Sequence, residues 1–191
     1  MPTLTTIILA AGRGTRIGTP KWRMLWNGER FLDMILHNLE KADISNLHVI
    51  MNGEEVVAFR NEFPHLFCFV NHEPEKGMIS SIRIGVEQSP PSDGYMIIMV
   101  DHPFVQAETY RTLQEAFLEN PGALIKPVYQ GKPGHPVIVP HVVFEKGFSN
   151  DPNITLHDMI VASGVQVQSV EVDDDGVASN VNTLDQLRSK R

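Results

Sequence analysis

The strongest constraint on the fold is the stretch from Thr5 to Lys21, in which an apolar segment runs directly into a glycine-rich loop. The apolar segment ends at Leu9, and the loop holds Gly12, Gly14 and Gly18 with basic residues between them. A buried strand that ends in such a loop is typical of an anion site, because glycine has no Cβ and lets backbone amides approach a phosphate closely. The stretch therefore predicts a polyphosphate site at the end of a buried strand.

Two well-known phosphate loops do not fit this stretch. The dinucleotide-binding fingerprint Gly-x-Gly-x-x-Gly has two residues in its second gap, whereas Gly14 and Gly18 enclose three. A P-loop has glycine immediately before its lysine, whereas Lys21 follows Pro20.

The same residues resemble the signature of the MobA-like nucleotidyltransferases, which transfer a nucleoside monophosphate from an NTP to a phosphorylated acceptor. The matching positions are Leu9, Ala10, Ala11, Gly12, Arg16, Ile17, Gly18 and Lys21. The resemblance implies catalytic roles for Arg16 and Lys21, which would bind the triphosphate and stabilise the pyrophosphate leaving group. It also implies nucleotide binding by Leu9, Ala10, Ala11, Gly12, Arg13, Gly14 and Lys21. A glycine-rich turn with solvated arginines is the structural alternative, and Arg13 stands at a variable position of the signature.

Composition narrows the class of protein. A formal net charge of −7 argues against nonspecific binding to nucleic acid or to an anionic membrane surface. One cysteine, Cys68, cannot form a disulfide framework, and its apolar neighbours favour a buried position. The sequence shows neither a signal-peptide pattern at Met1 nor an uninterrupted apolar run long enough to cross a membrane. We therefore expect a cytoplasmic protein.

Strand and helix patterns alternate along the chain. Strands are expected at Leu47–Met51, Phe67–Val70, Tyr95–Val100, Ala123–Val128, Pro136–Val139 and Val165–Val172. Helices are expected at Phe31–Leu39, Glu54–Phe63, Met78–Val86, Gln106–Glu119, Thr155–Ser163 and Thr183–Leu187. This alternation predicts a Rossmann-like, three-layer α/β/α sandwich with a mostly parallel sheet, built as a single domain over residues 1–191.

Asp101 follows a strand that is apolar on both faces, and with Pro103 and Phe104 it resembles the family's D-x-P-F segment. Mg²⁺ prefers oxygen ligands, so we expect Asp101 to be the metal carboxylate, with Mn²⁺ as a possible substitute. The alternative is a turn residue that caps the next helix. His102 is either a phosphate contact or a structural histidine.

Two further segments resemble the molybdenum cofactor cytidylyltransferase branch. The first contains Asn71, Gly77 and Ser81, which the resemblance implies hold the nucleotide, although Pro74 is displaced from the family position. Capping serines at a helix start are the alternative. The second, Gly134–Val137, would place His135 at the acceptor, where Lys126 and Lys132 would also suit an anion. A tight turn with a structural histidine is its alternative.

The C-terminal part of the chain departs from the cytidylyltransferase pattern. Asn180 and Asn182 stand where that branch has acidic residues, and amides neutralise no charge. A second metal carboxylate is therefore unsupported there. The run Asp173–Gly176 is expected to be a solvated turn rather than a metal site.

The sequence thus predicts a nucleotidyltransferase that uses an NTP, with CTP favoured, and a phosphorylated acceptor, with molybdopterin cofactor favoured. A molybdoenzyme apoprotein is a possible partner. Ala11 and the segment Gly134–Val137 favour the cytidylyltransferase branch, whereas Asn180 and Asn182 favour the guanylyltransferase branch. Transfer to a sugar phosphate is also compatible with the sequence, as is a non-catalytic nucleotide-binding regulator or cofactor chaperone. A large acceptor pocket lined with cations would favour the pterin, and a shallow acidic or neutral pocket would favour the sugar phosphate.

Overall fold

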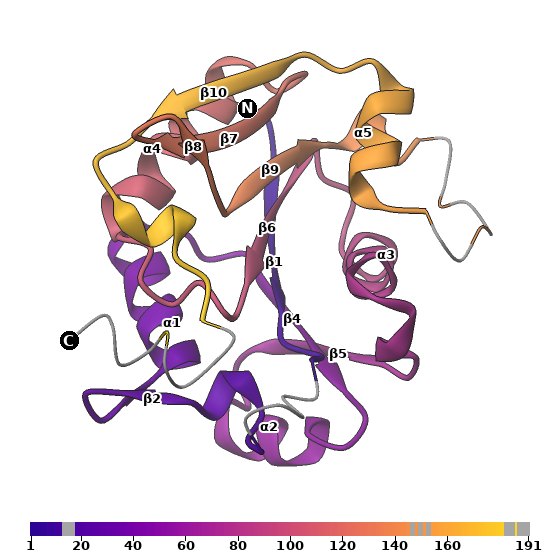
Figure 1. Cartoon of the computed structure of the whole chain (residues 1–191). Helices are drawn as coiled ribbons and strands as arrows, with labels where there is room; N and C mark the ends of the chain where they lie inside the picture. Colours follow the sequence, from indigo (N-terminus) through magenta and orange to yellow (C-terminus); the bar gives the residue numbers. More distant parts are fainter. Residues whose placement is uncertain (13–17, 146–147, 149–150, 152–153, 182–185, 187–191) are drawn as a thin grey trace.

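The alternating apolar segments form one large mixed sheet with helices on both faces (Figure 1). The computed structural model describes residues 1–12, 18–145, 148, 151, 154–181 and 186. Its strands are β1 (Leu4–Leu9), β2 (Leu25–Trp26), β3 (Glu29–Arg30), β4 (Leu47–Asn52), β5 (Phe67–Asn71), β6 (Gly94–Met99), β7 (Leu124–Tyr129), β8 (Lys132–Pro133), β9 (Val137–Pro140) and β10 (Val167–Glu171). Its α-helices are α1 (Phe31–Lys41), α2 (Val56–Glu62), α3 (Met78–Gln88), α4 (Ala107–Glu119) and α5 (Leu156–Ser163). Short 3-10 turns are η1 (Lys21–Arg23), η2 (Pro74–Lys76), η3 (His141–Val143) and η4 (Asp175–Ala178).

The strand order of the large sheet is β10-β7-β9-β6-β1-β4-β5, with β8 paired to β7. The pairs that β1 makes with β4 and β6 are parallel, as are β4 with β5 and β7 with β10. Strand β9 runs antiparallel to β6 and β7. The predicted three-layer sandwich with a mostly parallel sheet is confirmed, and β9 is the antiparallel exception that the apolar pattern alone did not reveal.

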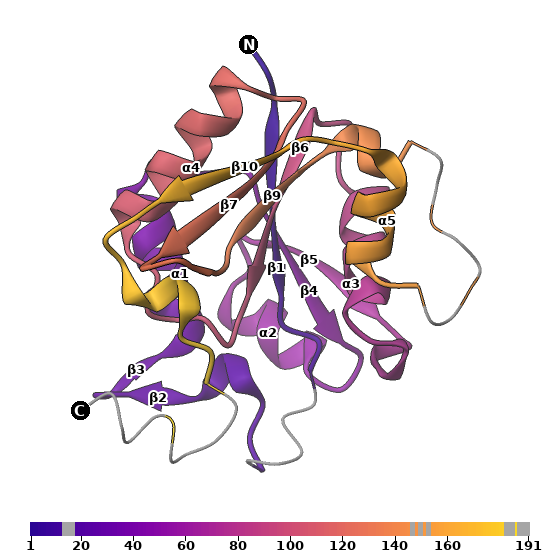
Figure 2. The same ribbon diagram turned by 45° about the horizontal axis from the view of Figure 1, so that its top comes forward.

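Successive side chains of the central strands point to opposite faces of the sheet, which explains the two apolar layers. Ile8 and Ile98 pack with helices α1, α2 and α4, whereas Ile7 and Ile97 pack with α3 and α5. Figure 2 shows the same division, with α1 and α4 on one side of the sheet and α3 and α5 on the other. Both faces of β1 and β6 are therefore buried, as their continuous apolar sequences predicted.

Register places the carboxyl ends of four strands at one edge of the sheet. Leu9, the last residue of β1, pairs with Met99 of β6 and Ile50 of β4. At the ends of β4 and β5, Asn52 pairs with Asn71. In open α/β sheets, ligands bind outside this edge. Ala10 and Ala11 after β1, Asn71 at the end of β5 and Asp101 after β6 lie at this edge.

Two local features differ from expectation. A hairpin of β2 and β3 separates η1 from α1, with Asn27 and Gly28 at positive φ in its turn. The segment 173–176 is not a wholly solvated turn, because the carboxylate of Asp174 is buried. It accepts hydrogen bonds from Gln106 N at 2.8 Å and from Thr109 Oγ1 at 2.6 Å, and so joins the start of α4 to the segment after β10.

Candidate active site

The first part of the site is the chain that leaves β1. Ala10 N–H donates to the Ile50 carbonyl at 2.9 Å, and Val100 N–H donates to the Leu9 carbonyl at 3.2 Å. These bonds extend the pairing of β1 with β4 and with β6 by one residue. Ala10 and Ala11, which follow β1, are buried. Gly12 follows at the rim. The predicted site residues Arg13, Gly14 and Arg16 lie outside the described residues, so their roles stay predictions.

Lys21 reaches the same place from η1. The next residue, Trp22, is fully buried, which fixes the turn to the body of the protein. Lys21 Nζ lies 2.7 Å from Asp101 Oδ2. Two residues that are eighty positions apart in the sequence, and that were selected from separate motifs, are therefore in direct contact.

Asp101 follows β6 directly and is 6% exposed. His102 Nδ1 lies 3.0 Å from Asp101 Oδ1, so each carboxylate oxygen has its own partner. Burial raises the pKa of this carboxyl, but the hydrogen bonds from His102 and Lys21 outweigh that effect and lower the pKa to about 2. Asp101 is therefore an anion at neutral pH, which is the form that a metal ligand needs.

Helix α3 supplies the opposite wall through Gly77, Met78 and Ser81. Gly77 has φ of 82°, a left-handed conformation that glycine adopts without strain, where the chain turns into the helix. Asn71 Nδ2 donates to Ser80 Oγ at 2.8 Å and to Ser81 Oγ at 2.9 Å. Asn71 Oδ1 accepts from Glu73 N–H at 2.9 Å. Asn71 thus shapes the wall from a buried position, and its predicted contact with a nucleotide stays a prediction.

These elements enclose a cavity of about 220 Å³. Its lining combines both motif segments and the start of α3, namely Leu9, Ala11, Gly12, Lys21, Pro74, Gly77, Met78, Ser81, Met99, Val100 and Asp101. One wall is apolar and the other carries an ammonium and a carboxylate. Such a cavity can hold an apolar ring at one end and a charged, oxygen-rich group at the other.

His135 lies next to His102, the residue that follows the cavity-lining Asp101, with 5.0 Å between the ring centroids. Burial lowers the pKa of His135 to about 4, and the neighbouring His102 ring adds to this effect while Asp101 partly opposes it. His135 is therefore neutral at pH 7 and offers a hydrogen bond rather than a charge. Its backbone N–H donates to the Val177 carbonyl at 2.9 Å.

The C-terminal segment approaches the site from the other side. Val181 N–H donates to the Asp101 carbonyl at 2.8 Å, and the Val181 side chain is buried. The backbone of Asn180, the residue before Val181, therefore lies near that of Asp101. Asn182 lies outside the described residues.

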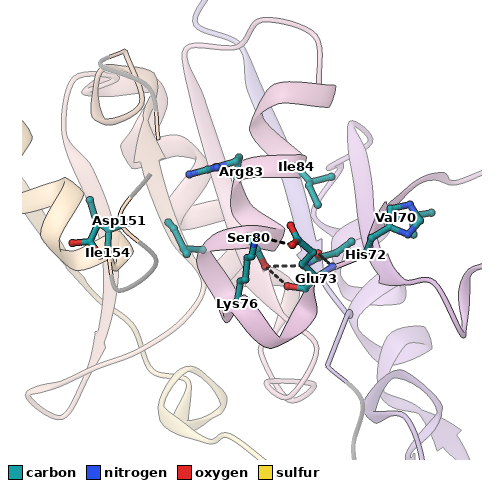
Figure 3. Close-up of a pocket in the computed structure, with 11 residues that line it drawn as sticks. Val70, His72, Glu73, Lys76, Ser80, Arg83, Ile84, Asp151 and Ile154 are labelled. Atoms are coloured by element: carbon teal, nitrogen blue, oxygen red, sulfur yellow. Dashed lines mark hydrogen bonds and ion pairs between the residues drawn. The ribbon is translucent and has the colours of Figure 1, made fainter. Parts of the chain in front are cut away.

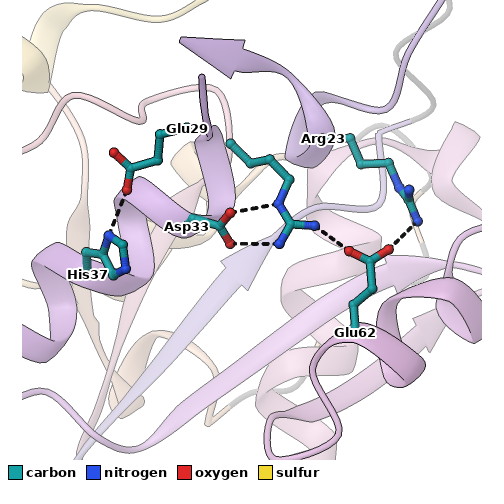
Figure 4. Close-up of polar contacts among 6 residues, drawn as sticks. Arg23, Glu29, Asp33, His37 and Glu62 are labelled. Carbon is teal, nitrogen blue, oxygen red and sulfur yellow. Dashed lines mark hydrogen bonds and ion pairs between the residues drawn. The ribbon is translucent and has the colours of Figure 1, made fainter. Parts of the chain in front are cut away.

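Sequence reasoning missed the residues that hold the site in place. Asn52, the last residue of β4, donates from Nδ2 to the Ala11 carbonyl at 3.2 Å. Arg23 and Arg30 both bind Glu62, and Arg30 also binds Asp33, as Figure 4 shows. Because carboxylates already engage these two guanidinium groups, the network stabilises the turn that carries Lys21 rather than adding cations to the cavity. An Asn-Gly pair after a strand was the available signal for Asn52.

A second cavity, of about 430 Å³, lies on the other side of α3 (Figure 3). Its basic residues are already paired: Lys76 Nζ lies 2.6 Å from Glu73 Oε1, and the Arg83 guanidinium lies over the Phe148 ring at 5.1 Å. The lining includes neither Lys21 nor Asp101. The larger cavity therefore does not contain the residues that both motifs brought together.

The donor set at Asp101 suits a hard, oxygen-preferring cation. Within the described part of the chain, no group of three or more His, Cys, Asp and Glu side chains is arranged to hold a metal. A single buried, ionised carboxylate is enough for Mg²⁺ or Mn²⁺, because such ions complete their coordination shells with substrate phosphates and water. None of the described helices combines the length and apolar character needed to cross a bilayer.

Comparison with known proteins identifies the family and the fold. A model of the MobA-like NTP transferase domain matches residues 6–149, which is well over half of the chain. The fold is similar to that of Rv0371c from Mycobacterium tuberculosis H37Rv, with 23% identity, a TM-score of 0.76, and 98% of this chain and 96% of that chain covered. A structure of Rv0371C in complex with manganese, from the same organism, is 21% identical, with a TM-score of 0.72 and coverage of 98% and 97%.

A third solved structure, the molybdopterin-guanine dinucleotide biosynthesis protein A from Archaeoglobus fulgidus, is 17% identical. Its TM-score is 0.66, and 97% of this chain and 95% of that chain are covered. At such low identities these likenesses show the fold alone. The single-domain organisation of residues 1–191 and the cytoplasmic location stay predictions.

Proposed function

The chain belongs to the MobA-like NTP transferase domain family, a family of nucleotidyltransferases, and we propose that it moves a nucleoside monophosphate from an NTP to a phosphorylated acceptor. CTP is the favoured donor and molybdopterin cofactor the favoured acceptor. The observation that carries the proposal is the contact between Lys21 and Asp101 at the rim of one cavity. It joins a cation and an ionised carboxylate at the place where the family's two motifs meet.

In the proposed reaction, an oxygen of the acceptor phosphate attacks the α-phosphorus of the NTP. A new phosphorus–oxygen bond forms there, and the bond to the oxygen that bridges to the β-phosphate breaks. Pyrophosphate leaves with that electron pair. Negative charge increases on the leaving group, and the Lys21 ammonium is the described cation that can stabilise it. No covalent enzyme intermediate is required.

Asp101 is the residue proposed to hold a divalent cation. When bound, Mg²⁺ or Mn²⁺ would neutralise phosphate charge in this site. The ionised state of Asp101 supports this role, and so does manganese in the similar structure from M. tuberculosis. His102 fixes the orientation of the carboxylate through its 3.0 Å contact. Asn180 precedes Val181, whose N–H donates to the Asp101 carbonyl, and an amide there would offer an oxygen to the cation without adding charge.

The apolar end of the cavity is proposed to receive the nucleobase. Met78 and Ser81 line it, and Asn71 holds Ser81 in position. The preference for CTP rests on the sequence resemblance to the cytidylyltransferase branch, at Ala11 and at Gly134–Val137. GTP is the alternative donor, which Asn180 and Asn182 favour.

One observation favours a second acceptor class. His135, proposed to contact the acceptor, is neutral and has another imidazole, His102, as its ring neighbour. A neutral residue at this position is the lining expected for a sugar phosphate, whereas a pocket lined with cations was expected for the pterin. The experiment therefore includes both acceptor classes, molybdopterin and a sugar phosphate.

The decisive experiment measures pyrophosphate release from each of the four NTPs with Mg²⁺ and either molybdopterin or a sugar phosphate. We expect release with CTP and molybdopterin. Asp101→Ala should abolish it, whereas Asp173→Ala, at an exposed carboxylate, should retain it. Nucleotide binding without release from any pair would identify a regulator or cofactor chaperone instead. Turnover that persists in Asp101→Ala would show that the metal site is elsewhere.

A further inference from the structure

Helix α2 is linked to two walls of the cavity through neighbouring residues, although none of the described cavity-lining residues belongs to it. Its start is attached through Asn52, which is 3% exposed. Asn52 Oδ1 accepts the N–H groups of Glu54 and Glu55, both at 3.0 Å. Asn52 Nδ2 donates to the Ala11 carbonyl. One side chain thus ties the entry to α2 to the residue that precedes Gly12.

The other end of α2 is attached to the residues that follow Lys21. Trp22 packs edge-on against Phe59 and Phe63, with ring centroids 5.7 and 6.3 Å away. The Arg23 guanidinium lies 4.3 Å from the centroid of the Trp22 ring, and its Nη2 donates to Glu62 Oε1 at 2.7 Å. Glu62 also binds Arg30, at the start of α1 (Figure 4).

Ala11 and Gly12 on one side, and Lys21 on the other, face the same cavity. Their separation is therefore set by a common support, because α2 holds Ala11 through Asn52 and holds the Lys21 turn through Trp22 and Glu62. We propose that Asn52 and Glu62 are positioning residues that set the spacing between these two walls for the polyphosphate of the nucleotide. This inference rests on the proposed function, since it assigns the polyphosphate to this cavity.

A positioning role predicts a change in nucleotide affinity, whereas a purely structural role predicts a change in the free energy of unfolding. Glu62 and its arginine partners are about one third exposed, and ion pairs at that exposure contribute little to the free energy of unfolding. Glu62→Gln should therefore leave the fold intact. A misplaced Lys21, by contrast, weakens contacts to the β- and γ-phosphates and leaves the nucleobase end unchanged.

The test compares nucleotides with increasing numbers of phosphates. Calorimetric titrations with CMP, CDP and CTP, and with GMP, GDP and GTP, are made in Mg²⁺ on the wild-type protein, Asn52→Ala and Glu62→Gln. Glu108→Gln is the matched control, because it removes the partner of Arg111 on α4, away from the cavity. The melting temperature of each variant is recorded alongside.

We expect both variants to weaken triphosphate binding about tenfold and monophosphate binding less than about threefold, with Glu108→Gln unchanged. Equal weakening of mono- and triphosphate, or no weakening of the triphosphate, would overturn the positioning role. If Asn52→Ala does not fold, Glu62→Gln decides alone. Wild-type binding of CTP without pyrophosphate release would sink the proposed reaction, yet the phosphate series would still test the positioning role. Absence of any nucleotide binding by the wild type would overturn both.

Discussion

The contact between Lys21 and Asp101 makes a quantitative prediction for the variant Lys21→Met. The wild-type pKa of Asp101 is about 2, against an ordinary value of 3.8. That difference corresponds to about 2.4 kcal/mol of stabilisation, at about 1.36 kcal/mol per pKa unit. The hydrogen bonds from His102 and Lys21 together lower the pKa of Asp101, although burial alone would raise it. Removing the ammonium leaves a buried carboxylate with one partner, so we expect a loss of about 2 kcal/mol in the free energy of unfolding at neutral pH.

The pH dependence follows from the direction of the shift. A carboxyl whose pKa is lowered by folding stabilises the protein fully above its unfolded pKa, near pH 4. This stabilisation is lost as the pH falls through the folded pKa, near pH 2. The coupling between Lys21 and Asp101 should therefore be present at pH 5 to 7 and decline between about pH 4 and 2.

Reversible urea unfolding of a double-mutant cycle measures this coupling. The four proteins are the wild type, Lys21→Met, Asp101→Asn and the double variant, all in EDTA, so that other carboxyls cancel in the differences. Lys132→Met, at an exposed lysine, is the control and should change stability by less than about 0.5 kcal/mol. A coupling energy below about 0.5 kcal/mol at pH 7, or one that does not change toward pH 2, would refute this reasoning.

Three further predictions concern neighbouring features. Lys21→Met should tighten Mn²⁺ binding to the nucleotide-free protein about tenfold, measured by electron paramagnetic resonance, because the ammonium no longer occupies Asp101 Oδ2; unchanged affinity would place the metal elsewhere. Asp174→Ala should cost about 2–4 kcal/mol in urea unfolding, because Gln106, Thr109 and Gly176 lose their buried acceptor, whereas the exposed Asp173→Ala should be nearly neutral. Gly134→Ala should cost about 1–3 kcal/mol in thermal or urea unfolding, because its Cβ would lie 2.2 Å from the Val177 carbonyl oxygen. Gly122→Ala is the control, because no atom lies within 4 Å of its new Cβ. Equal losses of stability in the two variants would contradict the packing argument.

The layered fold was predictable from sequence because its strands and helices have strong, regular apolar patterns. Tyr95–Val100 is apolar at every position, which only a central strand covered on both faces explains, and β6 occupies that place. The helix expected at Thr155–Ser163 is present as α5, with a capping box at Thr155 and the left-handed Gly164 after its last residue. The direction of β9 in the sheet was not predictable, because its apolar pattern is the same whether it runs parallel or antiparallel to β6.

The site was predictable where a local motif carries the chemistry. Lys21 and Asp101 were selected separately, and the fold brings them into contact. The supporting residues were not predictable, because an asparagine in a turn or an acid in Asp173–Gly176 has the same local sequence whether it is solvated or buried. Asn52 and Asp174 acquire their roles from partners more than forty positions away along the chain.

The bond between Val181 N–H and the Asp101 carbonyl has a consequence for the order in which the site can form. The site combines residues from the first strand, the middle of the chain and Val181, and the contacts of Asp101 with Lys21 and with Val181 close long loops. Long-range closures of this kind form late and slowly during folding. A partly folded chain or a proteolytic fragment that retains β1 would therefore keep the glycine-rich motif but not the site. Nucleotide binding would then report on completed folding of the chain as well as on activity.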